Sequence, residues 1–455
     1  MFHRFSQDRI GRLTRRAVLI ACLGILFGPE ISRGQESNWP QWRGPDGTGV
    51  ATADADPPVL WSEQENVRWK LKLPGLGHST PVVWSDRIFL TSAVPVGEEL
   101  PPKFSGRPGA HDNIPVTRRH QFLVIAAKRA DGQIAWQMKV NEALPHEGGH
   151  YTTSLASASP VTDGEHLIAY FGSYGLYCLD LNGKVLWRKH LGLMHSKHGH
   201  GEGSSPALFG NIVVVNWDHE EQSFIVALDK RSGVELWREP RDEVTSWASP
   251  LIVTHQGRQQ VIVCGTTRVR GYHLQTGQVI WECGGLSANV VATPVAANGM
   301  VYVGSSYEMR SMLAIKLDGA AGDITHTDQV VWRRGDRTPY VPSPLLYGDH
   351  LYFLRHYQGI LTRVEAQTGY EPTGPFRLGN LRDVYASPVA AAKRIYITDL
   401  DGVTQVISND EIPRVLAVNR LDDSFSASAA IAGDEFFLRG REFFYCLAES
   451  STPPN

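Results

Sequence analysis

A motif of a small residue or Pro, then Ser or Thr, then Pro recurs along most of the chain. Its copies are Ser79-Thr80-Pro81, Ala158-Ser159-Pro160, Ser204-Ser205-Pro206, Ala248-Ser249-Pro250, Ala292-Thr293-Pro294, Pro342-Ser343-Pro344 and Ala386-Ser387-Pro388, with a degenerate eighth copy at Ala427-Ser428-Ala429. After a first interval of 79 residues, successive prolines are 46, 44, 44, 50 and 44 residues apart. A period near 44 residues is typical of β-propellers, in which each repeat forms one four-stranded blade.

A single repeat predicts four short strands. In the third repeat, β-rich runs lie at 206–209, 212–217, 223–229 and 234–237, and turn residues separate them at Gly210-Asn211 and Ser232-Gly233. The outer strand follows a Gly-x-x-x-Trp pattern, as in Gly183/Trp187 and Gly233/Trp237. Because the side-chain period of a strand is two, we expect these indoles to fill the space between blades.

The last repeat, residues 426–447, has only three predicted strands. A strand at 66–70, with its own Trp69, supplies the missing outer strand, and this pairing removes two exposed sheet edges. We therefore predict an all-β, eight-bladed propeller of four-stranded antiparallel blades over 59–449, closed by an N-terminal strand pairing with the C-terminal blade. An insertion at 94–119, which contains five prolines, explains the first long interval, since it cannot be a central strand. Residues 35–58 are predicted as an extended segment and 450–455 as a disordered tail.

Residues 1–34 are predicted to be a signal peptide. They carry six Arg against two acidic residues, and the apolar stretch 17–28 follows Arg15-Arg16. The pattern fits a general secretion signal and a twin-arginine signal equally well. Five apolar residues between Arg16 and Cys22 are too few to favour a lipoprotein anchor, and twelve cannot span a bilayer. We expect an exported, periplasmic or extracellular monomer without a transmembrane span.

Charge and cysteine content exclude several classes of protein. The chain has 44 Lys and Arg against 47 Asp and Glu, so it has no general basic field for nucleic acid. The four cysteines after the leader form no CxxC or CxxCH motif, and two of them stand in Tyr-Cys-Leu strand contexts. Buried thiols are the prediction. No nucleophile elbow, P-loop, zincin motif or dinucleotide fingerprint is present, so hydrolase chemistry has no support.

The repeat, together with the segment Trp39-Pro40-Gln41-Trp42-Arg43-Gly44-Pro45, resembles the pyrroloquinoline-quinone-like propeller family. One branch, the quinoprotein alcohol dehydrogenases, binds the quinone and a calcium ion at the channel mouth. The other, the outer-membrane assembly factor B-like branch, is eight-bladed, carries no cofactor and scaffolds other proteins. The quinoproteins typically have neighbouring cysteines that form a disulfide, and their blades are longer; this chain has no Cys-Cys pair and near-minimal blades. The resemblance therefore implies the second branch.

Histidines gather in loops predicted to lie on one face of the ring, because blade-to-blade links and second-to-third-strand loops emerge together. The predicted metal ligands are His146, His150, His198 and His200, and carboxylates accompany them. Imidazole and carboxylate suit a divalent transition metal. A polar binding patch and plain solvated loops are the alternatives.

A channel-mouth binding site is predicted from the same loops. Its predicted residues are Glu202, Asp218, His219, Glu220, Trp247, Arg268, Arg270, Arg310, Arg355 and His356. Arginine forks could hold a carboxylate or phosphate, or could pair with neighbouring carboxylates. No catalytic residue is assigned.

The resulting prediction is an exported, non-catalytic scaffold or ligand-binding propeller without a cofactor. Its predicted partner is another envelope protein or an extracellular polymer. The alternative is a pyrroloquinoline quinone-dependent dehydrogenase of alcohols or sugars. In that reading the quinone lies near Trp247 and the arginines, and Glu202, Asp218 or Glu220 serve as Ca²⁺ ligands or base.

Overall fold

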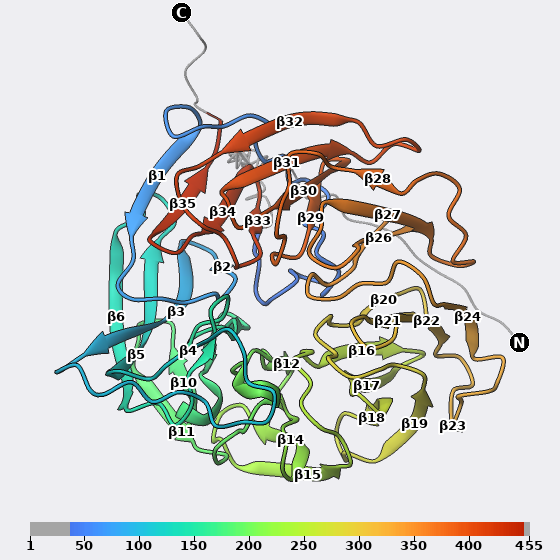
Figure 1. The fold of residues 1–455 in the computed structure, drawn as a ribbon, viewed down its shortest axis with the longest axis horizontal. Coiled ribbons are helices and arrows are strands. Elements are labelled where there is room, and N and C mark those ends of the chain that lie inside the picture. The colour runs from blue at the N-terminus through green and yellow to red at the C-terminus, as the bar shows by residue number, and fades with distance from the viewer. Residues whose placement is uncertain (1–36, 450–455) are drawn as a thin grey trace, which may run out of the picture. The chain divides into compact units, whose positions relative to one another are not determined.

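The computed structural model describes residues 37–449, and eight β-sheets follow one another in a ring around a central channel (Figure 1). The predicted signal peptide and tail lie outside the described residues. The predicted fold class, an eight-bladed propeller of antiparallel four-stranded blades, is confirmed.

Each blade is built from the channel outward, so that its first strand is the innermost and its last forms the outer edge. Blade 1 contains β2 (Val82–Trp84), β3 (Arg87–Val96), β5 (Arg119–Lys128) and β6 (Ile134–Ala143); blade 2 contains β8 (Val161–Thr162), β9 (His166–Tyr170), β10 (Leu176–Asp180) and β11 (Val185–Lys189). Blade 3 contains β12 (Ala207–Phe209), β13 (Ile212–Trp217), β14 (Ser223–Asp229) and β15 (Glu235–Arg241); blade 4 contains β16 (Leu251–His255), β17 (Arg258–Cys264), β18 (Arg268–His273) and β19 (Val279–Gly284), with β23 (Gly322–Asp323) added in parallel. Blade 5 contains β20 (Val295–Ala297), β21 (Met300–Ser305), β22 (Ser311–Lys316) and β24 (Val330–Arg334); blade 6 contains β25 (Leu345–Tyr347), β26 (His350–Leu354), β27 (Ile360–Glu365) and β28 (Phe376–Arg377). Blade 7 contains β29 (Val389–Ala391), β30 (Arg394–Thr398), β31 (Val403–Ser408) and β32 (Val415–Arg420); blade 8 contains β33 (Ala430–Ala432), β34 (Glu435–Arg439), β35 (Phe443–Leu447) and β1 (Val67–Lys72). The 3₁₀ helices η1 (Gly172–Tyr174) and η2 (Lys197–Gly199), and the two-stranded pair β4 (Asn113–Ile114) and β7 (Gly149–His150), lie in loops.

The ring closes as predicted, with β1 antiparallel to β35 (Figure 1). Trp69 on β1 packs between blades, where its indole donates to the carbonyl of Arg129 in blade 1. The same contact recurs round the ring: Trp136, Trp187, Trp237 and Trp332 donate to carbonyls of Leu181, Lys230, Leu274 and Ala366 in the next blade. The regular spacing of Gly and Trp therefore reflects inter-blade packing.

Glycine is required where each indole meets the next blade. At Gly183 the φ angle is +89°, and a Cβ atom there would lie 2.8 Å from the ring of Trp136. Any larger residue would push the indole away, and an L side chain is also strained at this φ. The Gly of one blade and the Trp of the preceding blade thus form one packing unit.

The Ser or Thr of each motif forms a hydrogen-bonded ring around the channel. The backbone N–H of one copy donates to the hydroxyl oxygen of the next at 2.8–3.0 Å, from Thr80 through Ser159, Ser205, Ser249, Thr293, Ser343 and Ser387 to Ser428. The series stops at the joint between blades 8 and 1, where the buried Thr80 hydroxyl has no partner among the described residues. At that joint the buried Arg439 donates to Ser79 Oγ instead, at 2.8 Å.

The segment before β1 is part of the propeller, whereas the sequence placed it outside. Trp39 is fully buried and pairs with Val83 through its backbone, and Val50 forms a parallel bridge to Ala390. Between them the buried Arg43 donates to the carbonyls of Thr48, Pro344 and Pro388. The segment thus joins blade 1 to blades 6 and 7 across one end of the channel.

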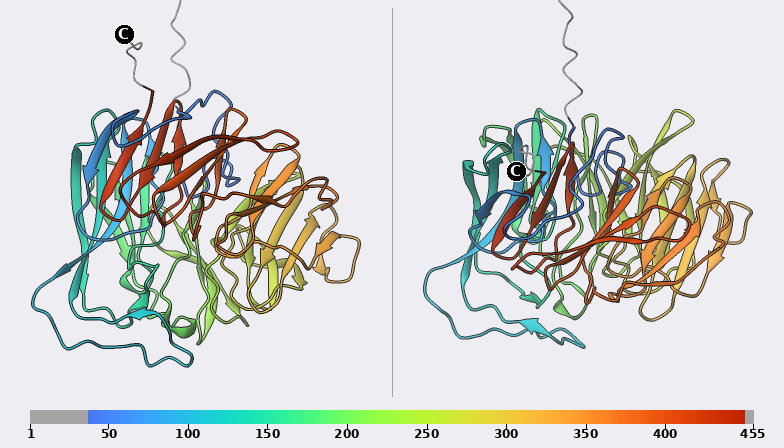
Figure 2. Two further views of the ribbon diagram at one scale, coloured as in Figure 1. Left: turned by 45° about the horizontal axis from the view of Figure 1, so that its top comes forward. Right: turned by 90° about the horizontal axis from the view of Figure 1, so that it is seen from above.

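The insertion projects from one face of the ring (Figure 2). Strands β3 and β5 extend into both ends of the predicted 94–119, and Pro95 pairs with His120. This Pro is tolerated because β2 pairs only with the first residues of β3, so Pro95 lies beyond the inner strand. The part of the insertion outside these strands is 97–118. It is held to the link between blades 1 and 2 by the pairing of β4 with β7.

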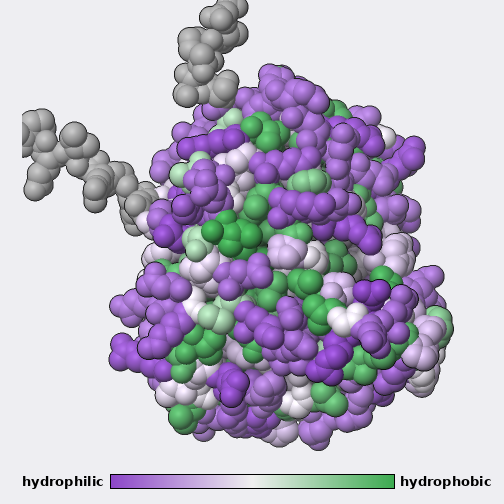
Figure 3. Space-filling model, turned by 90° about the vertical axis from the view of Figure 1, so that its left-hand side faces the viewer, coloured by the Kyte–Doolittle hydropathy of each residue, from purple (hydrophilic) through white to green (hydrophobic). Residues whose placement is uncertain are grey.

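The side of the ring that carries β1 and β6 is mostly hydrophilic, with scattered apolar side chains (Figure 3). Outer strands alternate between buried and exposed residues, as in β15, where Trp237 is buried and Leu236 is exposed. All four cysteines of 37–449 are buried and free, as predicted. Within this range no helix is long and apolar enough to cross a membrane.

Candidate functional site

A cavity of about 450 Å³ opens at the end of the channel that carries the insertion. We call it the open mouth. It is lined by His78, His111, Asp112, His150, Tyr151, His198, His200, Trp247, Tyr307, Tyr340, Tyr357, Asp383 and Tyr385, among others. A second cavity lies at the end crossed by the N-terminal segment, and Trp42 lines both. The N-terminal segment therefore divides the channel.

Aromatic side chains from blades 5 to 7 form one side of the open mouth. Tyr307 stacks on Tyr340 with ring centroids 5.8 Å apart, and Tyr357 stacks on Tyr385 at 5.2 Å. Tyr340 lies 5.6 Å from Tyr357, which joins the two pairs into an aromatic arc. Tyr307 is 53% exposed and adopts φ +111°, a conformation that strains any residue other than glycine. A strained, exposed aromatic side chain is typical of a binding surface.

The predicted residues Arg310, Arg355 and His356 lie beside this arc. The ring of His356 is 4.6 Å from both Tyr340 and Tyr357. Burial, reinforced by the charges of Arg310 and Arg355, lowers the pKa of His356. Both arginines are exposed. Neither guanidinium has a hydrogen-bond or ion-pair partner within 37–449, so both remain available to a ligand.

The opposite side of the open mouth carries His111, His150, His198 and His200, which we call the four-histidine cluster. His200 Nε2 lies 3.0 Å from His111 Nδ1, and the ring of His200 is 4.9 Å from His150 and 5.3 Å from His198. Three of these four residues were predicted as metal ligands. The fourth, His111, was not among the predicted ligands.

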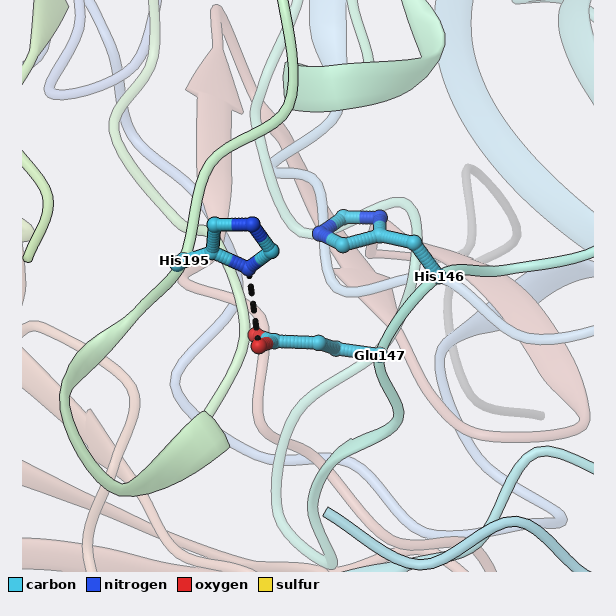
Figure 4. A group of neighbouring side chains, drawn as sticks. All are labelled: His146, Glu147 and His195. Atoms are coloured by element: carbon cyan, nitrogen blue, oxygen red, sulfur yellow. Dashed lines mark hydrogen bonds and ion pairs between the residues drawn. The ribbon is translucent and has the colours of Figure 1, made fainter. Parts of the chain in front are cut away.

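The predicted ligand His146 lies apart from this cluster. Its Nε2 is 2.7 Å from the carbonyl of Met194 and its Nδ1 is 3.0 Å from the hydroxyl of Tyr174. His146, Glu147 and His195 do converge, with His195 Nδ1 3.0 Å from Glu147 (Figure 4). Glu147 also accepts a hydrogen bond from Arg107 in the insertion, at 2.6 Å. Because both nitrogens of His146 are already engaged, this group fastens the insertion and offers no free ligand set.

Asp218, predicted as a mouth residue, is buried in an ion pair. Its carboxylate accepts two hydrogen bonds from Arg241, at 2.7 and 3.0 Å, and one from Ser246. Both side chains of the pair are 0% exposed. The prediction of a ligand role for Asp218 is therefore wrong, because a partner 23 residues away occupies its oxygens.

Glu220 and His219 are also engaged within the protein. Glu220 accepts hydrogen bonds from the backbone N–H and the hydroxyl of Thr245, at 3.1 and 2.7 Å. His219 is buried, with Nε2 3.2 Å from the carbonyl of Gln222. Both residues hold link loops in place.

Glu202 is half-buried beside a separate cavity of about 150 Å³. Burial raises the pKa of its carboxyl to about 7, although Ser173 donates to it through its N–H at 2.7 Å and its hydroxyl at 2.6 Å. The hydroxyl of Tyr170, which lines the same cavity, has no partner among residues 37–449. Glu202 thus does not reach the open mouth.

Arg268 and Arg270 are paired, as the alternative interpretation of the basic sector expected. Arg270 contacts Asp242, Glu243 and Glu282, and Arg268 contacts Glu282 and Asp323. Trp247, by contrast, does line the open mouth, and its indole donates to the carbonyl of Gly201 at 2.8 Å. The predicted set therefore divides into residues that face the mouth and residues that hold its walls.

The tyrosines of the aromatic arc were missed by sequence reasoning. Tyr340 and Tyr385 precede inner-strand motifs, and Tyr307 and Tyr357 occupy second-to-third-strand loops. Their signal in the sequence is their position, because the links between blades and the second-to-third-strand loops emerge on one face of the ring.

The family model described as outer membrane protein assembly factor BamB matches residues 120–371, more than half of the chain. The fold and this match define a pyrroloquinoline-quinone-like β-propeller. The chain belongs to the BamB family.

Solved structures share this fold at low sequence identity. BamB from Moraxella catarrhalis is 14% identical with a TM-score of 0.52, over 79% of this chain and 99% of that one. The quinohemoprotein alcohol dehydrogenase ADHIIG from Pseudomonas putida HK5 is 10% identical with a TM-score of 0.56, over 92% and 82%. The computationally designed Ika8 protein is 11% identical with a TM-score of 0.55, over 84% and 99%. A search of curated proteins found no match.

The open mouth does not fit a quinone with its calcium ion. Calcium requires several oxygen ligands, and the three carboxylates predicted to supply them are bonded to Arg241, Thr245 and Ser173. On that side the mouth is lined by four imidazoles, which suit transition metals instead, and by the single carboxylate of Asp112. The four buried cysteines also lie on separate strands.

Proposed function

We propose that this protein is an exported, non-catalytic propeller that binds a segment of another envelope protein at the open mouth. The observation that carries the proposal is the aromatic arc, which presents stacked tyrosines beside two unpaired arginines. Tyr, Trp and Arg are the residue types that dominate binding energy at protein interfaces. Membership of the BamB family supports a protein as the partner.

The shape of the site supports binding of a segment inserted from outside. The cavity is concave, and its wall is held by contacts between blades, so little order must be gained on binding. Tyrosine side chains supply large contact areas at low entropic cost and keep a hydroxyl for hydrogen bonding. The mouth is thus suited to an apolar or aromatic side chain of the partner, with the arginines at its rim.

Export is supported by the charge and apolar pattern of residues 1–34. Cell fractionation of the full chain tests it, and we expect the protein outside the cytoplasm. Substitution of Arg15 and Arg16 by Lys then separates the two routes, since the twin-arginine pathway requires the pair. Retention of the unaltered protein in the cytoplasm would contradict export.

Site-specific photo-crosslinking in intact cells tests the binding site. A benzophenone side chain at position 307 should crosslink to one envelope protein, whereas one at position 236 on β15 should not. The two positions are matched in exposure, at 53% and 48%. The crosslink at 307 should disappear in a Tyr340→Ala variant. Equal crosslinking at both positions would overturn the proposal, as would capture of a polysaccharide and no protein.

A separate assay tests the dehydrogenase alternative. Pyrroloquinoline quinone and Ca²⁺ are added to the purified protein, and quinone absorbance and dye reduction are followed with alcohols and aldoses. We expect neither a spectral change nor turnover. Dye reduction that depends on the quinone would show an enzyme instead.

A further inference from the structure

The four-histidine cluster draws its side chains from three separate segments. His111 belongs to the insertion, His150 to β7 in the link between blades 1 and 2, and His198 and His200 to the link between blades 2 and 3. These segments are already fixed to one another by their backbones. His150 N–H donates to the carbonyl of His200 at 3.2 Å, and Tyr151 N–H donates to the carbonyl of Asp112 at 2.9 Å. The rings are therefore brought together by the fold.

The third segment is fixed in the same way. Asn113, beside the insertion histidine, donates through its side chain to the carbonyl of His198 at 2.7 Å. The glycine content of these loops suggests flexibility, but these bonds already order them. Binding of an ion therefore does not have to offset the entropy cost of ordering the loops.

The ring nitrogens of His198 and His150 are held differently. His198 Nδ1 lies 2.9 Å from the carbonyl of Pro108, which can only accept, so this nitrogen carries the proton and Nε2 keeps its lone pair. His150 Nδ1 accepts a hydrogen bond from the backbone N–H of Thr152 at 3.3 Å and lies 2.7 Å from Thr152 Oγ1, so in the neutral ring its Nε2 carries a proton that a bound ion would displace. The hydrogen bond at the far nitrogen of His198 is the usual way in which a protein orients a metal-binding imidazole.

The central pair of the cluster is His111 and His200. Their rings stack with centroids 4.7 Å apart, and His200 Nε2 lies 3.0 Å from His111 Nδ1, at hydrogen-bond distance. Two nitrogens on a tetrahedral Zn²⁺, with bonds near 2.0–2.1 Å, stand about 3.3 Å apart, so an ion held by both rings would replace this hydrogen bond.

We propose that the four-histidine cluster binds one divalent first-row transition metal ion, which ties the insertion to the two neighbouring links at the open mouth. Four imidazoles and no thiolate favour Zn²⁺, Cu²⁺ or Ni²⁺ over Ca²⁺ or Mg²⁺. The convergent group His146, Glu147 and His195 is the competing location, but both nitrogens of His146, Nδ1 of His195 and the carboxylate of Glu147 are engaged in the protein. The inference stands on the cluster alone and does not depend on the proposed protein partner.

Metal titration of the mature chain without a polyhistidine tag tests the proposal. We expect one equivalent of Zn²⁺ to bind and to raise the thermal midpoint, and Co²⁺ to bind at the same site with visible absorption bands from nitrogen ligands. His111→Ala and His200→Ala should each weaken Zn²⁺ binding at least tenfold and abolish the Co²⁺ bands. His111 is exposed, so its variant should fold normally, and circular dichroism checks this.

Two matched variants serve as controls. His190→Gln changes an exposed histidine outside the cluster and should leave binding unchanged. His195→Gln removes a member of the competing group and should also leave it unchanged. Zn²⁺ binding that is lost with His195 and retained with His111 and His200 would overturn the proposal, as would an absence of stoichiometric binding to the unaltered protein.

Discussion

The two ends of the channel are framed by the same repeat, but one is crossed by the chain and the other is open. At the first end the N-terminal segment pairs with Val83 in blade 1 and with Ala390 in blade 7. Arg43 in this segment donates hydrogen bonds to three backbone carbonyls. At the open mouth, Arg310 and Arg355 face solvent with no partner among residues 37–449. Arg43 therefore stabilises the fold, whereas Arg310 and Arg355 are available to bind a ligand.

The difference shows that segments outside the repeat determine the use of each end. The blades supply seven hydrogen bonds between Ser or Thr motifs of neighbouring blades, and five inter-blade contacts of Trp indoles. The N-terminal segment and the insertion are not repeated. One joins blades across the channel, and the other brings His111 to the rim of the mouth. Function on this fold is therefore expected where the repeat is interrupted.

The largest expected effect on stability tests whether Asp218 supports the fold or binds a ligand at the open mouth. Asp218→Ala leaves the fully buried Arg241 without its carboxylate, and we expect a loss of about 3–5 kcal/mol in the free energy of unfolding. Urea denaturation measures it. Arg310→Ala, at the open mouth, should change stability by less than about 0.5 kcal/mol. A stable Asp218→Ala protein that no longer crosslinks at position 307 would place Asp218 in the mouth.

A second substitution tests the crossed end. Arg43→Met keeps most of the apolar volume but leaves the carbonyls of Pro344 and Pro388 without a donor. We expect a loss of about 3 kcal/mol, because each buried carbonyl without a partner costs about 1–3 kcal/mol. The exposed Arg355→Met is the matched control and should be neutral in the same thermal melt. Equal melting temperatures for the two variants would show that the segment does not fasten the blades.

The fold was predictable because its determinants are local and repeated. The position of Ser249 relative to Ser205, and of Trp187 relative to Gly233, follows from the repeat length, and the structure assigns each pair a specific inter-blade contact. The closing strand was found because Trp69 carried the same signature. What the repeat did not contain, such as the path of Arg43 across the channel, was not predicted.

The site was predicted less well, because a polar loop residue is free or paired according to what lies opposite it. The sequence predicted both Asp218 and Arg270 as mouth residues, but Asp218 is paired with Arg241 and Arg270 with Glu243. His111 took the place expected for His146 because β4 pairs with β7, and no period in the sequence encodes that pairing. The tyrosines carry no charge and were not predicted, although they stand in the same loops, which emerge on one face of the ring.

The ring between the two ends offers a smaller test. Ser249→Ala removes the acceptor for the N–H of Ser205, and we expect a loss of about 1–2 kcal/mol. Thr80→Val is the matched change at the closing joint, where the hydroxyl is buried without a partner among residues 37–449, so it should be neutral or slightly stabilising. Urea denaturation compares the two variants. Equal losses would mean that the closing joint is hydrogen-bonded like the other seven.

The smallest effect on stability is expected at the open mouth itself, in the strained Tyr307. Tyr307→Gly relieves a backbone held at φ +111°, and it loses a stacking contact with Tyr340 worth about 0.5–1.5 kcal/mol. Because the two effects oppose each other, the thermal midpoint should stay within a few degrees of that of the unaltered protein. Tyr307→Ala loses the same ring but keeps the strain, so it should be less stable than the Gly variant by about 1 kcal/mol or more. Both variants should lose binding of the partner protein captured at position 307, measured by crosslinking from a second mouth position, Tyr151. If the Gly variant still binds, the strain does not serve recognition, and the aromatic arc would have to act through Tyr340, Tyr357 and Tyr385 alone.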